Sequence, residues 1–118
     1  EKTESRTLLK FHPALAPFTA AVFPLVKKDG MPEVAHQIEA DLRRQFNVVY
    51  DEKGAVGRRY RRQDEIGTPF AITVDGDSVA DGTVTVRNRD SMAQDRIPAD
   101  SVRRYLEDQI DAWTPADS

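Results

Sequence analysis

A β-strand, an amphipathic helix and a second β-strand follow one another early in the chain, and this order constrains the fold most strongly. The apolar run at 20–23 is short and is stopped by Pro24, a pattern typical of a buried strand. Apolar residues then recur at helical spacing over 32–46, and 47–50 is a β-rich run. Two strands joined through a helix are predicted to be parallel, in a right-handed βαβ unit.

The rest of the chain continues this alternation of helices and strands. The expected elements are a polar helix at 58–66, strands at 70–74, 83–87 and about 92–97, and an amphipathic helix from about residue 100 onward. Residues 75–82 form a short, turn-rich loop, so the strands on either side are predicted to be an antiparallel hairpin or close neighbours. The predicted fold class is therefore α/β, a mixed five-stranded sheet flanked by three helices.

Chain length and the lack of cysteine limit the possible architectures. A chain of 118 residues is expected to form one domain with one hydrophobic core. We expect a proline-rich lead-in at 1–18, a folded domain at 19–113 and a frayed tail at 114–118. The absence of cysteine excludes disulfides and cysteine-based zinc sites. Since no apolar run approaches the ~20 residues of a membrane span, the sequence predicts a soluble, intracellular segment of a longer protein.

The sequence offers no recognisable residues for catalysis or metal binding. Its two histidines, His12 and His36, lie far apart, and neither has a partner at metal-ligand spacing. No nucleophile elbow, glycine-rich phosphate loop or Ser-His-Asp order is present. We therefore predict no catalytic residue, no metal site and no cofactor on this fragment.

Basic side chains are concentrated in the predicted polar helix, although the formal charge of the whole chain is −3. At 100° per residue its arginines spread around most of the helix, so at least one is expected to face inward while others reach solvent. These residues are Arg58, Arg59, Arg61 and Arg62. Two interpretations remain open: a solvated helix paired with its own acidic residues at 64–65, or a nucleic-acid contact surface.

A second polar and basic set lies on the strand at 83–87 and favours the nucleic-acid interpretation. Strand periodicity requires Thr83, Thr85 and Arg87 to share one face, with Arg89 just beyond. A sheet face with hydroxyls and an arginine suits single-stranded RNA, whose unpaired bases expose their Watson–Crick edges. The nearby acidic loop carries carboxylates that can accept from exocyclic amines but repel phosphate, namely Asp75, Asp77 and Asp81.

Three longer sequence blocks resemble one known family. Residues 11–17 read FHPALAP, residues 57–70 read GRRYRRQDEIGTPF, and residues 83–92 read TVTVRNRDSM. Together with the run AVFPL at 21–25, they closely resemble the C-terminal anticodon-binding domain of class II glycyl-tRNA synthetases. The resemblance extends over about 8–110, nearly the whole chain.

This resemblance implies a fold and a setting. The fold is a five-stranded mixed sheet with three helices, in agreement with the order of elements above. The implied parent enzyme joins glycine to its tRNA through a glycyl-adenylate, using ATP and Mg²⁺ in a separate catalytic domain from which residues 1–18 lead. The implied partners are the anticodon loop of glycine tRNA and that catalytic domain, in a cytoplasmic homodimer without membrane contact. The fragment itself is expected to hold the anticodon and to perform no chemistry.

The resemblance also implies which residues contact the anticodon. In related domains the arginine that follows the Val-x-Val strand reads a base, and Arg87 matches it. The acidic loop before that strand is expected to contribute Asp77 and Ser78, although Ser78 departs from the glutamate of a threonine-specific relative. The other expected contacts are Arg59, Arg61 and Arg62 on the helix and Thr83, Thr85 and Arg89 on the strand. For each helix arginine a structural role is the alternative.

Two other functions are compatible with the same sequence. The domain resembles, less closely, the accessory subunit of the mitochondrial DNA polymerase, which descends from these enzymes and uses the fold for protein and DNA contacts. The net acidity also suits a free-standing protein-interaction domain, and that alternative predicts no tRNA binding.

Overall fold

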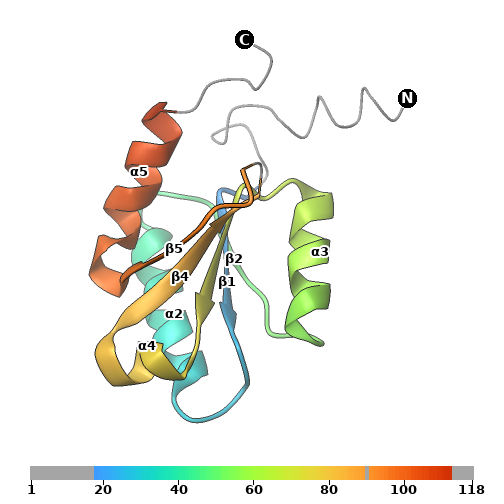
Figure 1. Ribbon diagram of the computed structural model, residues 1–118, viewed down its shortest axis with the longest axis vertical. Helices are drawn as coiled ribbons and strands as arrows, with labels where there is room; N and C mark the ends of the chain where they lie inside the picture. The colour runs from blue at the N-terminus through green and yellow to red at the C-terminus, as the bar shows by residue number, and fades with distance from the viewer. Residues whose placement is uncertain (1–17, 90, 113–118) are drawn as a thin grey trace.

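The computed structural model describes residues 18–89 and 91–112 (Figure 1). The elements are β1 (Ala20–Pro24), α2 (Met31–Leu42), β2 (Val48–Tyr50), α3 (Val56–Ile66), β3 (Phe70–Val74), α4 (Gly76–Asp81), β4 (Thr83–Asn88), β5 (Gln94–Pro98), the 3₁₀ helix η2 (Ala99–Ser101) and α5 (Val102–Ala112). The predicted lead-in up to residue 17 and the predicted tail at 114–118 lie outside the described residues.

The strands form one mixed sheet in the order β2-β1-β3-β4-β5. β1 pairs in parallel with both β2 and β3, so that Ala20 lies between Val48 and Phe70. β3 is antiparallel to β4, and β4 is antiparallel to β5. The structure therefore confirms the predicted α/β class, the five-stranded mixed sheet and the parallel pairing of the first two strands.

The prediction of a loop at 75–82 is wrong, because this segment contains α4. Asp75 Oδ1 accepts a hydrogen bond from the backbone N–H of Ser78 (3.1 Å), and Ser78 Oγ accepts one from the backbone N–H of Asp75 (2.9 Å). This reciprocal capping box satisfies donors that the start of a helix leaves unpaired. Gly82 ends the helix at φ 77°, where glycine is unstrained. The described residues thus form four α-helices, where the sequence predicted three.

The other differences are shifts in where elements begin and end. α2 ends at Leu42, and Phe46 packs against the core from the turn that follows. β5 begins at Gln94, two residues later than expected, and η2 precedes the start of α5 at Val102. Such end residues depend on local hydrogen bonding that apolar periodicity does not specify.

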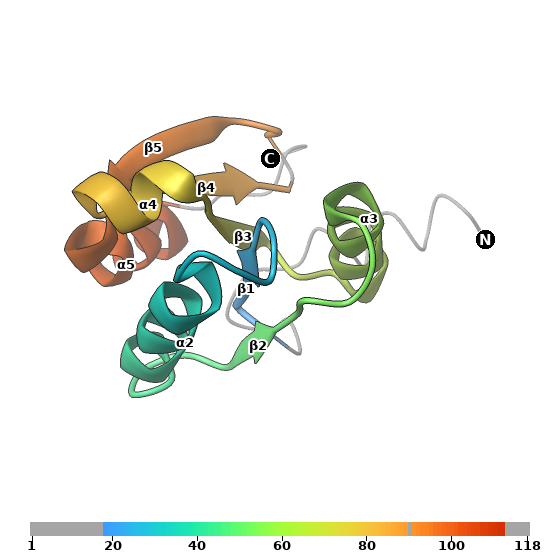
Figure 2. The same ribbon diagram turned by 90° about the horizontal axis from the view of Figure 1, so that it is seen from below.

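Helices cover the two faces of the sheet unequally. α2, α4 and α5 lie on one side, whereas α3 lies alone on the other (Figure 2). The larger core fills the three-helix side, and its large, fully buried side chains include Leu42, Phe70, Ile72 and Leu106. The α3 side has a smaller cluster, against which Tyr60 packs, formed by Ala21, Phe23 and Ala71.

Part of the α3 side of the sheet is left uncovered by this helix. Arg87 is opposite Ala71 across the β3–β4 ladder, so both face α3, which lies over β1 with Tyr60 edge-on to Phe23. Farther along the sheet, the same side is formed by β4 and β5. We call this surface the β4–β5 face and define it by Thr83, Thr85, Arg87 and Arg96. The prediction that the two threonines and Arg87 share one side of the strand is confirmed.

Candidate nucleic-acid interface

Arg59 points into the protein. Its side chain ties α3 to two loops: Nε donates to the carbonyl of Gly54 (3.1 Å), Nη2 donates to that of Leu25 (3.2 Å), and Nη1 donates to that of Pro24. Only 3% of Arg59 is exposed, and its guanidinium lies 5.9 Å from the centre of the Phe23 ring. This position supports the structural alternative for Arg59 and confirms that one arginine of the cluster faces inward.

Arg62 is partly exposed and pairs with a buried carboxylate. Its Nη1 donates to Asp51 Oδ2, which also accepts from Gln63 Nε2 at 3.4 Å, while the backbone N–H of Lys53 donates to Asp51 Oδ1 at 3.1 Å. Burial alone would raise the pKa of Asp51, but the Lys53 N–H and the Arg62 guanidinium hold it below its usual range. Arg62 therefore already neutralises one carboxylate, and only part of its side chain remains exposed.

Arg58 and Arg61 are the two exposed arginines of α3. Within residues 18–89 and 91–112, the structure records no hydrogen bond or ion pair for either side chain. A long cationic side chain without such a contact is suited to a phosphate, which needs charge but little geometric precision. Of the three predicted helix contacts, Arg61 is therefore the one with an exposed side chain and no recorded partner in the described residues, and Arg58, which was not among the predicted contacts, shares these properties.

Arg87 lies at the border between α3 and the β4–β5 face. Its Nη1 and Nη2 donate to the two carboxylate oxygens of Asp64 at 3.2 and 3.3 Å, and its guanidinium lies 4.9 Å from the centre of the Tyr60 ring. Nη2 also contacts Met92 Sδ at 3.3 Å, and only 9% of the residue is exposed. The guanidinium of Arg87 is therefore held in place by two side chains of α3.

Arg96 is a residue of the β4–β5 face that the sequence-based prediction did not include. It lies opposite Thr85 on β5, is exposed at its surface, and forms a double hydrogen bond with the carboxylate of Asp75 at 2.8 and 2.9 Å. It also donates to the hydroxyls of Thr83 (2.8 Å) and Thr85 (3.1 Å). Alternation along 94–98 is the signal that could have placed this side chain beside the threonines, but only once the β4–β5 register is known.

The remaining predicted contacts lie at the two ends of β4. Ser78 is 3% exposed and caps α4, whereas the side chain of Asp77 is 77% exposed, with a carboxylate oxygen 4.0 Å from Arg96 Nη2. Arg89 is half-buried at the other end, and its backbone N–H donates to the carbonyl of Pro69 at 2.8 Å. The structure thus brings Asp77 to the predicted face and places Ser78 beneath it.

The Asp75–Arg96 pair predicts how stability depends on pH. Hydrogen bonds from Arg96 lower the pKa of Asp75 to about 2, and the capping bonds from Ser78 act in the same direction, against burial. Since the folded-state pKa lies below the unfolded value of about 3.9, ionised Asp75 stabilises the fold above about pH 4, and this stabilisation is lost as the pH falls towards 2. Urea titrations at pH 5, 4, 3 and 2 should show the difference in unfolding free energy between the wild type and Asp75→Asn shrinking with acid. A difference that stays constant would contradict this assignment.

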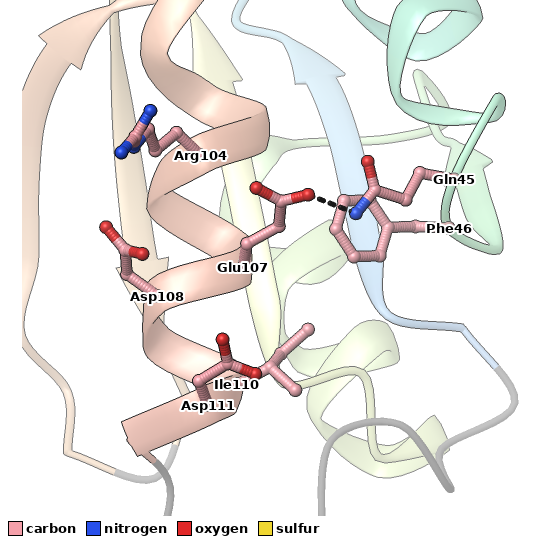
Figure 3. A pocket seen from close by; sticks show the side chains of 7 residues that line it. All are labelled: Gln45, Phe46, Arg104, Glu107, Asp108, Ile110 and Asp111. Carbon is pink, nitrogen blue, oxygen red and sulfur yellow. Dashed lines mark hydrogen bonds between the residues drawn. The ribbon is translucent and has the colours of Figure 1, made fainter.

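Sites of other kinds are scarce in the part of the chain that the structure describes. There, no three His, Cys, Asp or Glu side chains lie close enough to hold a metal ion. No helix in the same residues is long and apolar enough to cross a membrane. A cavity of about 580 Å³ lies between α5 and the turn after α2, with Gln45 Nε2 donating to Glu107 at its rim (Figure 3). None of the residues predicted to contact RNA lines this cavity.

Comparison with known sequences gives one consistent result. A family model described as "Anticodon binding domain" matches residues 19–109. The glycine–tRNA ligase of Rhodopirellula baltica is 58% identical over 113 residues, which are 96% of this chain and 21% of that relative. The ligases of Treponema denticola and Clostridium perfringens are each 54% identical, covering 89% and 93% of this chain and 23% of each relative. The chain therefore spans about a fifth of the length of these relatives.

A solved structure shows the same fold. It is the RNA-binding domain of the threonyl-tRNA synthetase from Cryptosporidium parvum, which superimposes with a TM-score of 0.77 and 23% sequence identity. The match covers 86% of this chain and 26% of that chain. At this identity the similarity is one of fold.

Proposed function

Because the chain belongs to the anticodon-binding domain family, we propose that it holds the anticodon loop of glycine tRNA for a glycine–tRNA ligase. The observation that carries this proposal is the β4–β5 face, a partly exposed sheet surface that combines threonine hydroxyls, guanidinium groups and carboxylates. Donors and acceptors side by side suit the Watson–Crick edges of unpaired bases, which are themselves mixed. A surface for phosphate alone would need only positive charge.

We assign different tasks to the two basic regions. Arg58 and Arg61, on the exposed side of α3, are suited to hold the phosphate backbone. Thr85, Arg87 and Asp77, on or beside the β4–β5 face, are suited to contact bases. This division explains how a chain with a formal charge of −3 can bind a polyanion, because carboxylates are placed where bases, not phosphates, are expected.

For the parent protein, we propose the activity named in its relatives, ligation of glycine to tRNA. The reaction proceeds through a glycyl-adenylate, with ATP and Mg²⁺ in a separate catalytic domain of the same chain, in a cytoplasmic homodimer. The support is the 54–58% identity to glycine–tRNA ligases, of which this chain covers 21–23%. The present domain then contributes binding free energy and discrimination, while bond formation takes place elsewhere.

Titration with short RNA hairpins tests the proposal directly. The chain is titrated with the anticodon stem-loop of a glycine tRNA and with a stem-loop that differs only in the anticodon bases, at low and moderate salt. We expect tighter binding of the glycine stem-loop and NMR shifts concentrated on β4 and β5. An absence of binding at low salt, or equal binding of the two hairpins at every salt concentration, would contradict the proposal.

The exposed arginines of α3 should set the salt dependence of binding without affecting the choice of anticodon. Arg61→Gln and Arg58→Gln should weaken all stem-loops alike and reduce the slope of log K against log salt by roughly 0.7–0.9 for each phosphate that is no longer neutralised. Arg104→Gln is the matched control, because this exposed arginine lies on α5, on the opposite side of the sheet. A loss confined to the glycine stem-loop would instead place the α3 arginines at a base.

A further inference from the structure

The hydrogen bonds of Arg96 use all of its donors. An arginine side chain has five N–H groups, one on Nε and two on each Nη. Nε donates to Thr83 Oγ1, Nη1 to Asp75 Oδ2 and Thr85 Oγ1, and Nη2 to Asp75 Oδ1 and the Thr83 carbonyl, at 2.8–3.3 Å. The guanidinium is thus fully satisfied by the protein itself.

This saturation determines what Arg96 can still offer to RNA. Every N–H bond of a guanidinium lies in its plane, so acceptors that meet all five surround its edge and leave its two flat faces without hydrogen bonds. The side chain of Arg96 is nevertheless 34% exposed on the β4–β5 face. Arg96 can therefore neither fork onto a base edge nor grip a phosphate unless it first loses a bond that it already has.

We propose that the guanidinium of Arg96 is a stacking platform for one unpaired base of the anticodon loop, an inference that rests on the proposed function. Flat guanidinium faces stack on nucleobases, and this contact accepts any base because every base has a π-face. Two segments hold the guanidinium in place before RNA arrives: Asp75 at the start of α4, and Thr83 and Thr85 on β4. Little side-chain freedom is then left to lose on binding, which favours affinity.

The guanidinium groups of Arg87 and Arg96 differ in what they can offer to a base. Arg87 has the Tyr60 ring against its guanidinium and is 9% exposed, so it has little free surface for stacking. Its Nε, however, has no acceptor recorded within the described residues, so Arg87 keeps a donor that Arg96 lacks. The two arginines of the face therefore differ in kind: Arg87 is the one that can donate to a base edge, and Arg96 is the one that can support a base plane.

An abasic scan of the hairpin separates stacking from other contacts. Each nucleotide of the glycine anticodon loop is replaced in turn by an abasic one, and binding to the wild-type chain and to Arg96→Lys is measured. We expect one position at which the abasic change weakens wild-type binding about tenfold but hardly changes binding to Arg96→Lys. Replacing that base with a different base should cost much less than removing it. Arg104→Lys is the matched control and should respond to every abasic change as the wild type does.

A second measurement uses the wild-type chain, so that it does not depend on whether Arg96→Lys perturbs the β4–β5 face. A base stacked on Arg96 should shift its Nε–H proton resonance upfield through the ring current, and the abasic hairpin at the coupled position should abolish that shift. An Nε–H resonance that does not move on saturation, or equal abasic losses in the wild type and Arg96→Lys, would overturn the stacking assignment. If no hairpin binds the wild-type chain at all, the proposed function fails with it, whereas selective binding without this coupling overturns the stacking role alone.

Discussion

Replacing Arg59 with methionine should lower the free energy of unfolding by about 3 kcal/mol, because buried carbonyls that it serves lose their donors. The residue is 3% exposed and binds the carbonyls of Pro24, Leu25 and Gly54, so its loss releases both the loop after β1 and the loop before α3. Methionine keeps much of the aliphatic volume but removes the donors and the positive charge, including the guanidinium contact with the Phe23 ring. Urea denaturation monitored by circular dichroism provides the measurement.

Arg61→Met is the matched control for this stability experiment. It makes the same chemical change two positions along α3, at an exposed residue with no hydrogen bond recorded in the described part of the chain. Its unfolding free energy should stay within about 0.5 kcal/mol of the wild type. Equal losses in the two variants would mean that the change in the helix itself, and not the buried contacts of Arg59, sets the cost.

Arg87→Ala should reduce both stability and anticodon discrimination. The variant loses the double hydrogen bond to Asp64 and the contact with the Tyr60 ring, which together should cost about 2 kcal/mol of unfolding free energy. If Arg87 also reads a base, the glycine stem-loop should lose ~1–3 kcal/mol of binding free energy and the altered stem-loop much less. Denaturation and hairpin titration measure the two effects separately.

Asp64→Asn separates the two roles of Arg87. It removes the charge of the Asp64 carboxylate, which weakens the ion pair with the Arg87 guanidinium, and it leaves Arg87 itself unchanged. If Arg87 reads a base, the Asp64→Asn variant should retain the preference for the glycine stem-loop, whereas the Arg87→Ala variant should lose it. Equal weakening of both hairpins by Arg87→Ala would reduce Arg87 to a residue that only positions α3 on the sheet.

Much of the fold could be predicted because its strands and helices differ in apolar periodicity. The fully buried strand at Ala20–Pro24 and the two-residue alternation around Val84 and Val86 specify a central strand and a one-sided strand directly. The helix α4 could not be found in this way, since six residues are too few for a periodic pattern. The sequence signal for α4 was the spacing of Asp75 and Ser78, which allows them to cap a helix start reciprocally. The segment is also acidic and contains glycine, so the sequence-based interpretation is a turn.

The site was less predictable because it depends on contacts between distant residues. Which of four neighbouring arginines turns inward is decided by how α3 lies on the sheet, and in the structure Arg59 and Gln63, one turn apart, face the interior. Arg96 and its partner Asp75 are 21 residues apart in sequence and meet only through the register of β4 and β5. The residue types on the strand were sufficient to predict that the threonines and Arg87 share a face. They could not show which guanidinium groups the protein's own carboxylates already bind.

The position of β5 at the border of the sheet has a consequence for self-association. A border strand exposes unpaired backbone groups to which another chain can add, and this is a common route to aggregation. In β5, Asp95 and Arg96 place a charge on each side of the strand, and Pro98 removes a backbone donor at its end. β5, which forms part of the surface that we propose to bind RNA, is thereby a poor template for strand pairing with a second copy of the chain.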